Sequence, residues 1–173
     1  MAVRQILQLG NPGLRVMCTP VRSFEAMNLG ALRDDLRDTL DDVRKRRGFG
    51  RAIAAPQIGR PERVIFLGGD SPLLLVNPAI IQRSRKRITL WDDCFSFPDI
   101  LVKVKRNLAI DVRYQDSDGK RRTLHAEGSL SELLQHEIDH LDGVLAIDRA
   151  IDTRHIVLRS EYEKLQASGE RAY

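Results

Sequence analysis

The stretch from Leu134 to Gly143 reads L-Q-H-E-I-D-H-L-D-G and predicts the central helix of the fold. Residues four positions apart share one face of an α-helix, so His136 and His140 can present two imidazole nitrogens to one metal ion. Glu137, directly after the first histidine, can then reach a water on that ion. This H-E-x-x-H arrangement is typical of helix-borne metal sites in which the glutamate acts as general base. The site still needs a third ligand.

The composition is that of a globular chain. Of its 173 residues, 42% are hydrophobic and 30% are charged, which predicts one domain covering residues 1–173. No segment approaches the roughly 18 consecutive apolar residues of a membrane helix, and the N-terminus lacks the pattern of a secretory signal. We therefore expect a cytoplasmic protein that has no membrane partner.

Cysteine content and charge bear on two further classes, disulfide-stabilised proteins and nucleic-acid-binding proteins. Two cysteines, Cys18 and Cys94, are too few for a disulfide framework. The net charge is +4, and basic residues cluster at 44–47, at 83–87 and at Lys103, Lys105 and Arg106. No nucleic-acid motif accompanies these clusters, so we interpret them as solvated surface and expect no sequence-specific nucleic-acid binding.

Periodicity predicts mixed helices and strands. Leucines at three- and four-residue spacing predict an amphipathic helix over residues 28–47, followed by a small-residue loop and strand at 48–59. Ser129 and Glu132 form a capping-box pattern ahead of the histidines, and a last helix is expected over residues 152–168. Runs favouring strands occupy residues 63–67, 73–81, 86–91, 101–114 and 121–125.

Three residues compete to be the third metal ligand. The metzincin pattern would place a histidine at position 146, where this chain has Ala146, which carries no donor atom. Glu161, on the predicted last helix, is at a plausible separation but has no distinctive neighbours. Cys94 follows a predicted strand directly, and a Cys-His-His set leaves one open coordination position. Cys18, among apolar neighbours, is instead expected to be buried.

Three separated motifs agree with one known family. They are A-A-P-Q at residues 54–57, D-D-C-F-S at 92–96 and Q-H-E-I-D-H at 135–140. In this order and spacing they resemble the peptide deformylases. The stretches I-L-Q-L-G-N-P-G-L-R at 6–15 and H-L-D-G-V-L-A-I-D-R at 140–149 extend the resemblance over the whole chain.

The resemblance implies a metal-dependent hydrolase that removes the formyl group from the initiator methionine of nascent polypeptides and releases formate. It implies one divalent metal per chain, Fe²⁺ physiologically, with Zn²⁺, Ni²⁺ or Co²⁺ as substitutes. Cys94, His136 and His140 would bind this metal. The catalytic residues would be Glu137 as general acid and base, with Gln57 and the backbone N–H of Phe95 stabilising the oxyanion. The partners would be N-formylmethionyl nascent peptides and, through the basic clusters, the ribosome surface.

The chain departs from the family pattern on the substrate side. The usual Glu-Gly-Cys-Leu-Ser motif is Asp-Asp-Cys-Phe-Ser here, so Asp93 replaces a glycine; Ala52 replaces another glycine, and Arg51 an apolar residue. We assign substrate binding to Ala52, Asp93 and Leu133. An Asp93 carboxylate in the groove would add negative charge and favour basic or amidated peptides.

These observations predict an α+β fold in which antiparallel or mixed strands surround a central metal-binding helix, with helices near both ends. Asp139 is expected to lie behind the ligands, where it would hold an imidazole tautomer. Three alternative functions stay open: a catalytically weak or silent deformylase-like binding module with a structural metal, a deformylase of a different formylated substrate, and a generic zinc peptidase.

Overall fold

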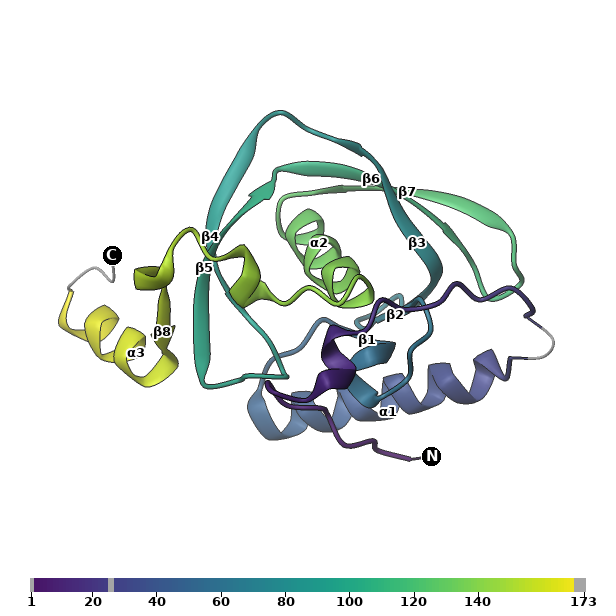
Figure 1. The fold of residues 1–173 in the computed structure, drawn as a ribbon, viewed down its shortest axis with the longest axis horizontal. Helices are drawn as coiled ribbons and strands as arrows, with labels where there is room; N and C mark the ends of the chain where they lie inside the picture. The colour runs from purple at the N-terminus through teal and green to yellow at the C-terminus, as the bar shows by residue number, and fades with distance from the viewer. Residues whose placement is uncertain (1, 25–26, 170–173) are drawn as a thin grey trace.

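A computed structural model describes residues 2–24 and 27–169 of the chain. Two of its three α-helices lie on opposite faces of a five-stranded antiparallel sheet, and a smaller sheet stands beside them (Figure 1). The α+β prediction is confirmed. The helices are α1 (Leu29–Arg47), α2 (Ser129–Leu141) and α3 (Arg159–Ser168). The strands are β1 (Ala52–Ala54), β2 (Val64–Leu67), β3 (Leu73–Arg83), β4 (Arg87–Asp93), β5 (Ile100–Asn107), β6 (Ala109–Gln115), β7 (Arg121–Glu127) and β8 (Ile156–Leu158).

The larger sheet has the strand order β1-β2-β3-β6-β7, and all its pairings are antiparallel. Its first strands are buried on both faces, as the continuous apolar run Val64–Leu67 of β2 requires. One face packs against α2 through Leu134, Ile138 and Leu141. The opposite face packs against α1 through its buried leucines. Helix α2 is thus enclosed by packing on the apolar side of its amphipathic pattern.

Local sequence signals account for both ends of α1 and for the C-terminal end of α2. The Asn28 side chain accepts a hydrogen bond from the N–H of Ala31, which caps the start of α1, and Gly48 ends α1 at φ 77°. After α2, Gly143 takes φ 71°, and a Cβ there would lie 2.5 Å from the carbonyl oxygen of Arg15. The last residue of the H-L-D-G motif is therefore glycine for both conformational and steric reasons.

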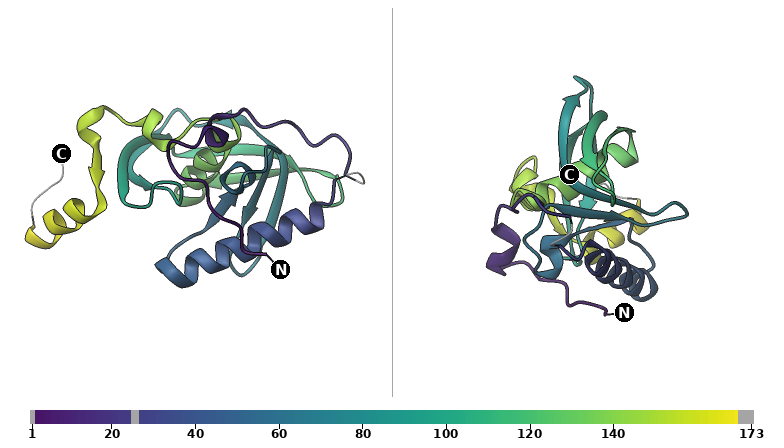
Figure 2. Two further views of the ribbon diagram at one scale, coloured as in Figure 1. Left: turned by 60° about the horizontal axis from the view of Figure 1, so that its bottom comes forward. Right: turned by 90° about the vertical axis from the view of Figure 1, so that its right-hand side faces the viewer.

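The smaller sheet has the order β4-β5-β8 and brings the C-terminal segment back beside the site. Its core cluster contains Cys94, Val102, Val104 and residues that follow α2. Helix α3 has no buried residue and projects at one end of the molecule, as the left view of Figure 2 shows. Among the described residues, no helix is both long enough and apolar enough to cross a bilayer.

Three local predictions were wrong. The run at 101–114 forms two strands, β5 and β6, which turn between Asn107 and Ala109. The predicted helix at 152–168 begins only at Arg159, because residues 153–155 form a 3₁₀ turn and β8 pairs with β5. The predicted capping box does not form: Gly128 is the N-cap of α2, and the Glu132 carboxylate pairs with Arg51. The ion pair of Glu132 with Arg51, which is distant in sequence, therefore forms in place of the local capping interaction.

Candidate metal and substrate site

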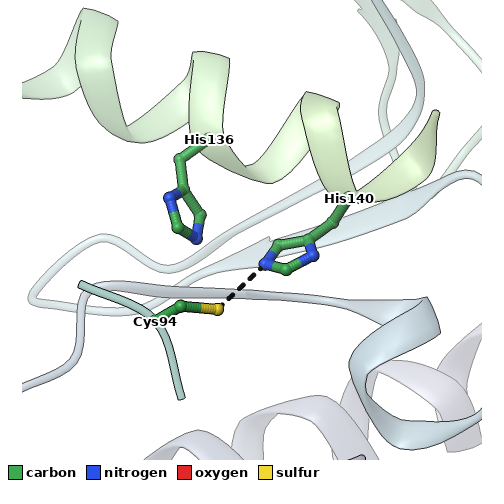
Figure 3. A group of neighbouring side chains, drawn as sticks. All are labelled: Cys94, His136 and His140. Atoms are coloured by element: carbon green, nitrogen blue, oxygen red, sulfur yellow. Dashed lines mark hydrogen bonds between the residues drawn. The ribbon is translucent and has the colours of Figure 1, made fainter. Parts of the chain in front are cut away.

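Two turns of α2 and the end of β4 bring together the three predicted metal ligands. One donor atom each from Cys94, His136 and His140 lies within 4.8 Å of the others, and all three residues are buried. The Sγ atom of Cys94 is 3.2 Å from Nε2 of His140 (Figure 3). The histidines point from one face of α2 toward the cysteine, as their four-residue spacing predicts.

Backbone geometry holds the cysteine at this point. Cys94 immediately follows β4, and its Sγ accepts a hydrogen bond from the Ser96 N–H at 3.5 Å. Gln57 is only 1% exposed, and its Nε2 lies 3.6 Å from the same sulfur. The Gln57 Oε1 accepts a hydrogen bond from the Ala54 N–H at 2.9 Å. Because that bond fixes which end of the amide is the acceptor, the Nε2 donor faces the site.

A buried ion-pair network supports the histidines from behind. Nδ1 of His136 lies 2.9 Å from the Asp92 carboxylate, which leaves Nε2 of His136 for a metal. Arg106, 5% exposed, pairs with Asp92 at 3.1 Å and also with Asp139. Burial opposes ionisation of Asp92, but His136 and Arg106 outweigh it and lower the pKa of Asp92 to about 2.

This network corrects two sequence interpretations. Asp139 contacts Arg106 and Arg149, and the carboxylate beside an imidazole belongs to Asp92. The sequence predicts solvated surface for Arg106, yet this residue is buried. The alternation in β5 carried the missing signal: Val102, Val104 and Arg106 face inward, so an arginine at that register requires buried carboxylate partners.

Glu137 is a buried acid beside the ligand cluster. It is 3% exposed, and burial raises the pKa of its carboxyl group from 4.5 to about 7. Within residues 2–24 and 27–169, its Oε2 has no hydrogen-bond partner. A carboxyl group with a free oxygen and a pKa near neutrality suits proton transfer to and from a water molecule.

The cluster opens into a pocket of about 540 Å³. The predicted substrate residues Ala52, Asp93 and Leu133 all line it. Phe95 lines it too, and its ring centroid lies 6.0 Å from that of Phe49. Gly50 takes φ 138°, and a Cβ there would come within 2.8 Å of the Phe95 ring. The small residues of the 48–59 segment therefore make room for the pocket's aromatic wall.

A family model described as "Polypeptide deformylase" matches residues 3–155. The chain belongs to the polypeptide deformylase family. It is 36% identical over 179 residues to a protein named "Peptide deformylase" from Rhizobium meliloti (strain 1021), with 99% of each chain covered. It is 37% identical to a "Peptide deformylase-like" protein from Brucella melitensis biotype 1, covering 96% of this chain and 99% of that one. The crystal structure of peptide deformylase from Thermotoga maritima matches with a TM-score of 0.80 and 32% identity, covering 88% of this chain and all of that one.

The departures from the deformylase family pattern have partners in the structure. Asp93 lines the pocket, but its Oδ2 pairs with Nη2 of Arg159 at 2.7 Å. The guanidinium carbon of Arg159 also lies 5.1 Å from the Phe49 ring centroid. The negative charge predicted at Asp93 is therefore paired with an arginine of α3, which the motif alone could not reveal. Arg51, at another of the three altered positions, pairs with Glu132.

The competing ligand candidate lies outside the cluster. Glu161 has a side chain that is 56% exposed and pairs with Lys164. It is not among the grouped donors, whereas Cys94 is. Cys18 is buried, as predicted, and burial raises the pKa of its thiol to about 11.

The donor set can hold a divalent ion of the kind deformylase chemistry needs. One thiolate and two imidazoles are ligands that zinc and divalent iron both accept, and three protein ligands leave a position for water or substrate. The spacing of the donor atoms allows all three to reach one ion. The Asp92 contact with His136 is the usual support for a metal-binding imidazole.

Proposed function

We propose that this deformylase-family chain hydrolyses the N-formyl group of formylmethionyl peptides, releasing formate and a free amino terminus. The observation that carries the proposal is the buried Cys94, His136 and His140 cluster, which opens on a pocket of about 540 Å³ beside the buried acid Glu137. Family membership supports the same reaction.

A divalent ion on these three ligands would supply Lewis acidity toward the formyl oxygen and would lower the pKa of a water. We propose Fe²⁺ as the physiological ion, with Zn²⁺, Ni²⁺ or Co²⁺ able to replace it. The soft thiolate ligand and two imidazoles are compatible with each of them, so the support for iron is the family resemblance.

Glu137 would move the protons. Its carboxylate accepts a proton from the attacking water as the oxygen–carbon bond forms, and it returns that proton to the amide nitrogen as the carbon–nitrogen bond breaks. The pKa of about 7 in the metal-free site suits both directions of transfer near neutrality. Gln57 Nε2 and the Phe95 backbone N–H would donate to the developing oxyanion. The bond between Gln57 Oε1 and Ala54 keeps that amide preorganised for this role.

The partners follow from the substrate. Formylated chains emerge from ribosomes, so the enzyme would act in the cytoplasm. The turn between β3 and β4 carries exposed basic residues, which suit weak contact with ribosomal RNA: Arg83, Arg85, Lys86 and Arg87.

The test is formate release from a formyl-Met-Ala-Ser peptide by anaerobically prepared, iron-loaded protein. Glu137→Gln should keep the metal and lose roughly 10²- to 10⁴-fold in kcat, since that is the usual contribution of a general acid or base. Metal retained with no formate from the wild type would favour the silent binding module. Cleavage of internal bonds in unformylated peptides would favour a zinc peptidase.

A further inference from the structure

The metal-site pocket adjoins a second cavity, and Arg44 and Arg51 line both of them. The second cavity measures about 420 Å³. Both cavities are lined by Arg44, Gly50, Arg51 and Leu133, which we call the arginine junction. The arginine junction therefore lines the same pocket as Cys94 and His136 of the ligand cluster.

Two glycines make room for the side chain of Arg44. A Cβ on Gly50 would lie 3.2 Å from Cγ of Arg44, and a Cβ on Gly68 would lie 3.7 Å from Nη1 of Arg44. The N–H of Gly68 donates to the Arg51 carbonyl at 2.8 Å. Nη1 of Arg44 and the carbonyl oxygen of Arg51 therefore both lie beside Gly68 at the junction.

The charges at the junction do not balance. Arg51 pairs with Glu132, and its Nη1 also donates to the Ser129 carbonyl at 3.0 Å. The carboxylate contact of Arg44 is with Asp41, 3.9 Å away and half exposed, a separation at which an ion pair is weak. Of the two guanidinium groups, Arg51 thus has a close carboxylate and Arg44 only a distant, exposed one, so the charge of Arg44 is the more weakly compensated.

The junction lies within reach of the reacting group. Glu132 precedes His136 by four residues on α2, which is about 6 Å along the helix axis. About two residues of extended peptide, or one residue with its side chain, cover that distance. Arg51 is 52% exposed at its side chain, so its remaining N–H groups can meet a substrate there.

We propose that Arg44 and Arg51 bind a carboxylate of the formylated substrate, one or two residues from the formyl group. This rests on the proposed deformylase function and names the substrate class: anionic formylated peptides. The carboxylate can come from an acidic side chain or from the C-terminus of a very short substrate. Guanidinium groups recognise either source through charge-assisted hydrogen bonds.

The experiment compares matched substrates on the metal-loaded protein. One arm pairs formyl-Met-Ala with its C-terminal amide, and the other pairs formyl-Glu-Ala-amide with formyl-Gln-Ala-amide. In at least one arm, kcat/KM should favour the carboxylate by about tenfold, the size expected for one added charge-assisted contact. The arm that responds identifies the source of the carboxylate. The ratio should shrink as salt rises.

Arg44→Met should lower that ratio about fivefold or more, because it removes the weakly compensated charge while keeping the stem that packs on Gly50. Arg47→Met, one turn later on α1 and outside both cavities, is the matched control and should leave the ratio unchanged. The double variant Arg51→Gln with Glu132→Gln should also lower the ratio of kcat/KM between carboxylate and amide substrates. If circular dichroism shows that Arg44→Met is misfolded, this double variant tests the carboxylate site in its place.

Titration calorimetry with reaction products separates this proposal from the proposed reaction. It compares the binding of Met-Ala with that of its amide, and the binding of Glu-Ala-amide with that of Gln-Ala-amide. If the carboxylate form binds more tightly, and this preference weakens in Arg44→Met, the carboxylate site at the junction is supported even when no formate is released. The absence of formate would refute only the deformylase activity. Equal binding and equal kcat/KM within both pairs would overturn the carboxylate site.

Discussion

The two sides of the pocket are built differently. On the metal side, Cys94, His136, Glu137 and His140 are each no more than 6% exposed, and buried ion pairs support them. On the substrate side, the side chains of Arg44, Arg51 and Arg159 are 45%, 52% and 27% exposed. Their ion pairs can exchange with solvent or ligand. The groups proposed to carry the chemistry are therefore tied to the core, whereas the groups proposed to set substrate choice can change at little cost to the fold.

Removing one metal ligand should have the largest effect on the buried side. Cys94→Ala should reduce bound metal from one ion per chain to a small fraction, because two imidazoles alone form an incomplete site. Metal content measured by mass spectrometry after dialysis checks this. Glu161→Ala is the matched control and should keep the ion. Unchanged stoichiometry in Cys94→Ala with loss in Glu161→Ala would reverse the assignment.

Removing the support behind the ligands should cost stability. Arg106→Met leaves Asp92 and Asp139 without their shared buried cation, so the free energy of unfolding should fall by about 3–5 kcal/mol. Urea denaturation of the metal-free protein measures it. Lys105→Met, exposed on the same strand, should change stability far less. Equal effects of the two variants would mean that the network contributes little.

The buried acid predicts a pH dependence of stability in the metal-free protein. The folded pKa of Glu137 is raised above its unfolded value, so its contribution is fully present below pH 4.5 and is lost as pH rises through about 7. Relative to Glu137→Gln, the wild type should lose about 2–3 kcal/mol of unfolding free energy between pH 5 and 8. Parallel stability curves for the two proteins over this range would contradict the raised pKa.

The smallest effect is expected at the exposed pair on the substrate side. A double-mutant cycle with Asp93→Asn and Arg159→Met should give a coupling below about 1 kcal/mol in stability, as partly exposed pairs do. Arg159→Met alone should disfavour acidic formyl peptides by a few fold in kcat/KM, because Asp93 then stands uncompensated. A coupling as large as the Arg106 effect would erase the contrast between the two sides.

Local patterns in the sequence determined most of the metal side. The i, i+4 spacing of His136 and His140 sets two ligands on one helix face, and the leucine periodicity of residues 28–47 sets α1. Both depend on neighbours within one or two helical turns, so no tertiary information is needed. The position of Cys94 directly after a strand, together with the family motifs, completed the predicted ligand set.

Tertiary structure alone decided the charged partners. Asp93 meets Arg159 across 66 residues of sequence, Arg51 meets Glu132 across 81, and Arg106 meets Asp139 across 33. The periodicity of charged residues along the chain does not indicate which residue a charged side chain will pair with. An acidic and a basic residue also fit an exposed position of the local pattern equally well. Spacing along the chain indicated the two histidine ligands, and the family motifs indicated the cysteine. The packing of β4 and β5 against α2, and of α3 beside β8, decided which charges are paired, because Coulomb partners are chosen by distance in space and not along the chain.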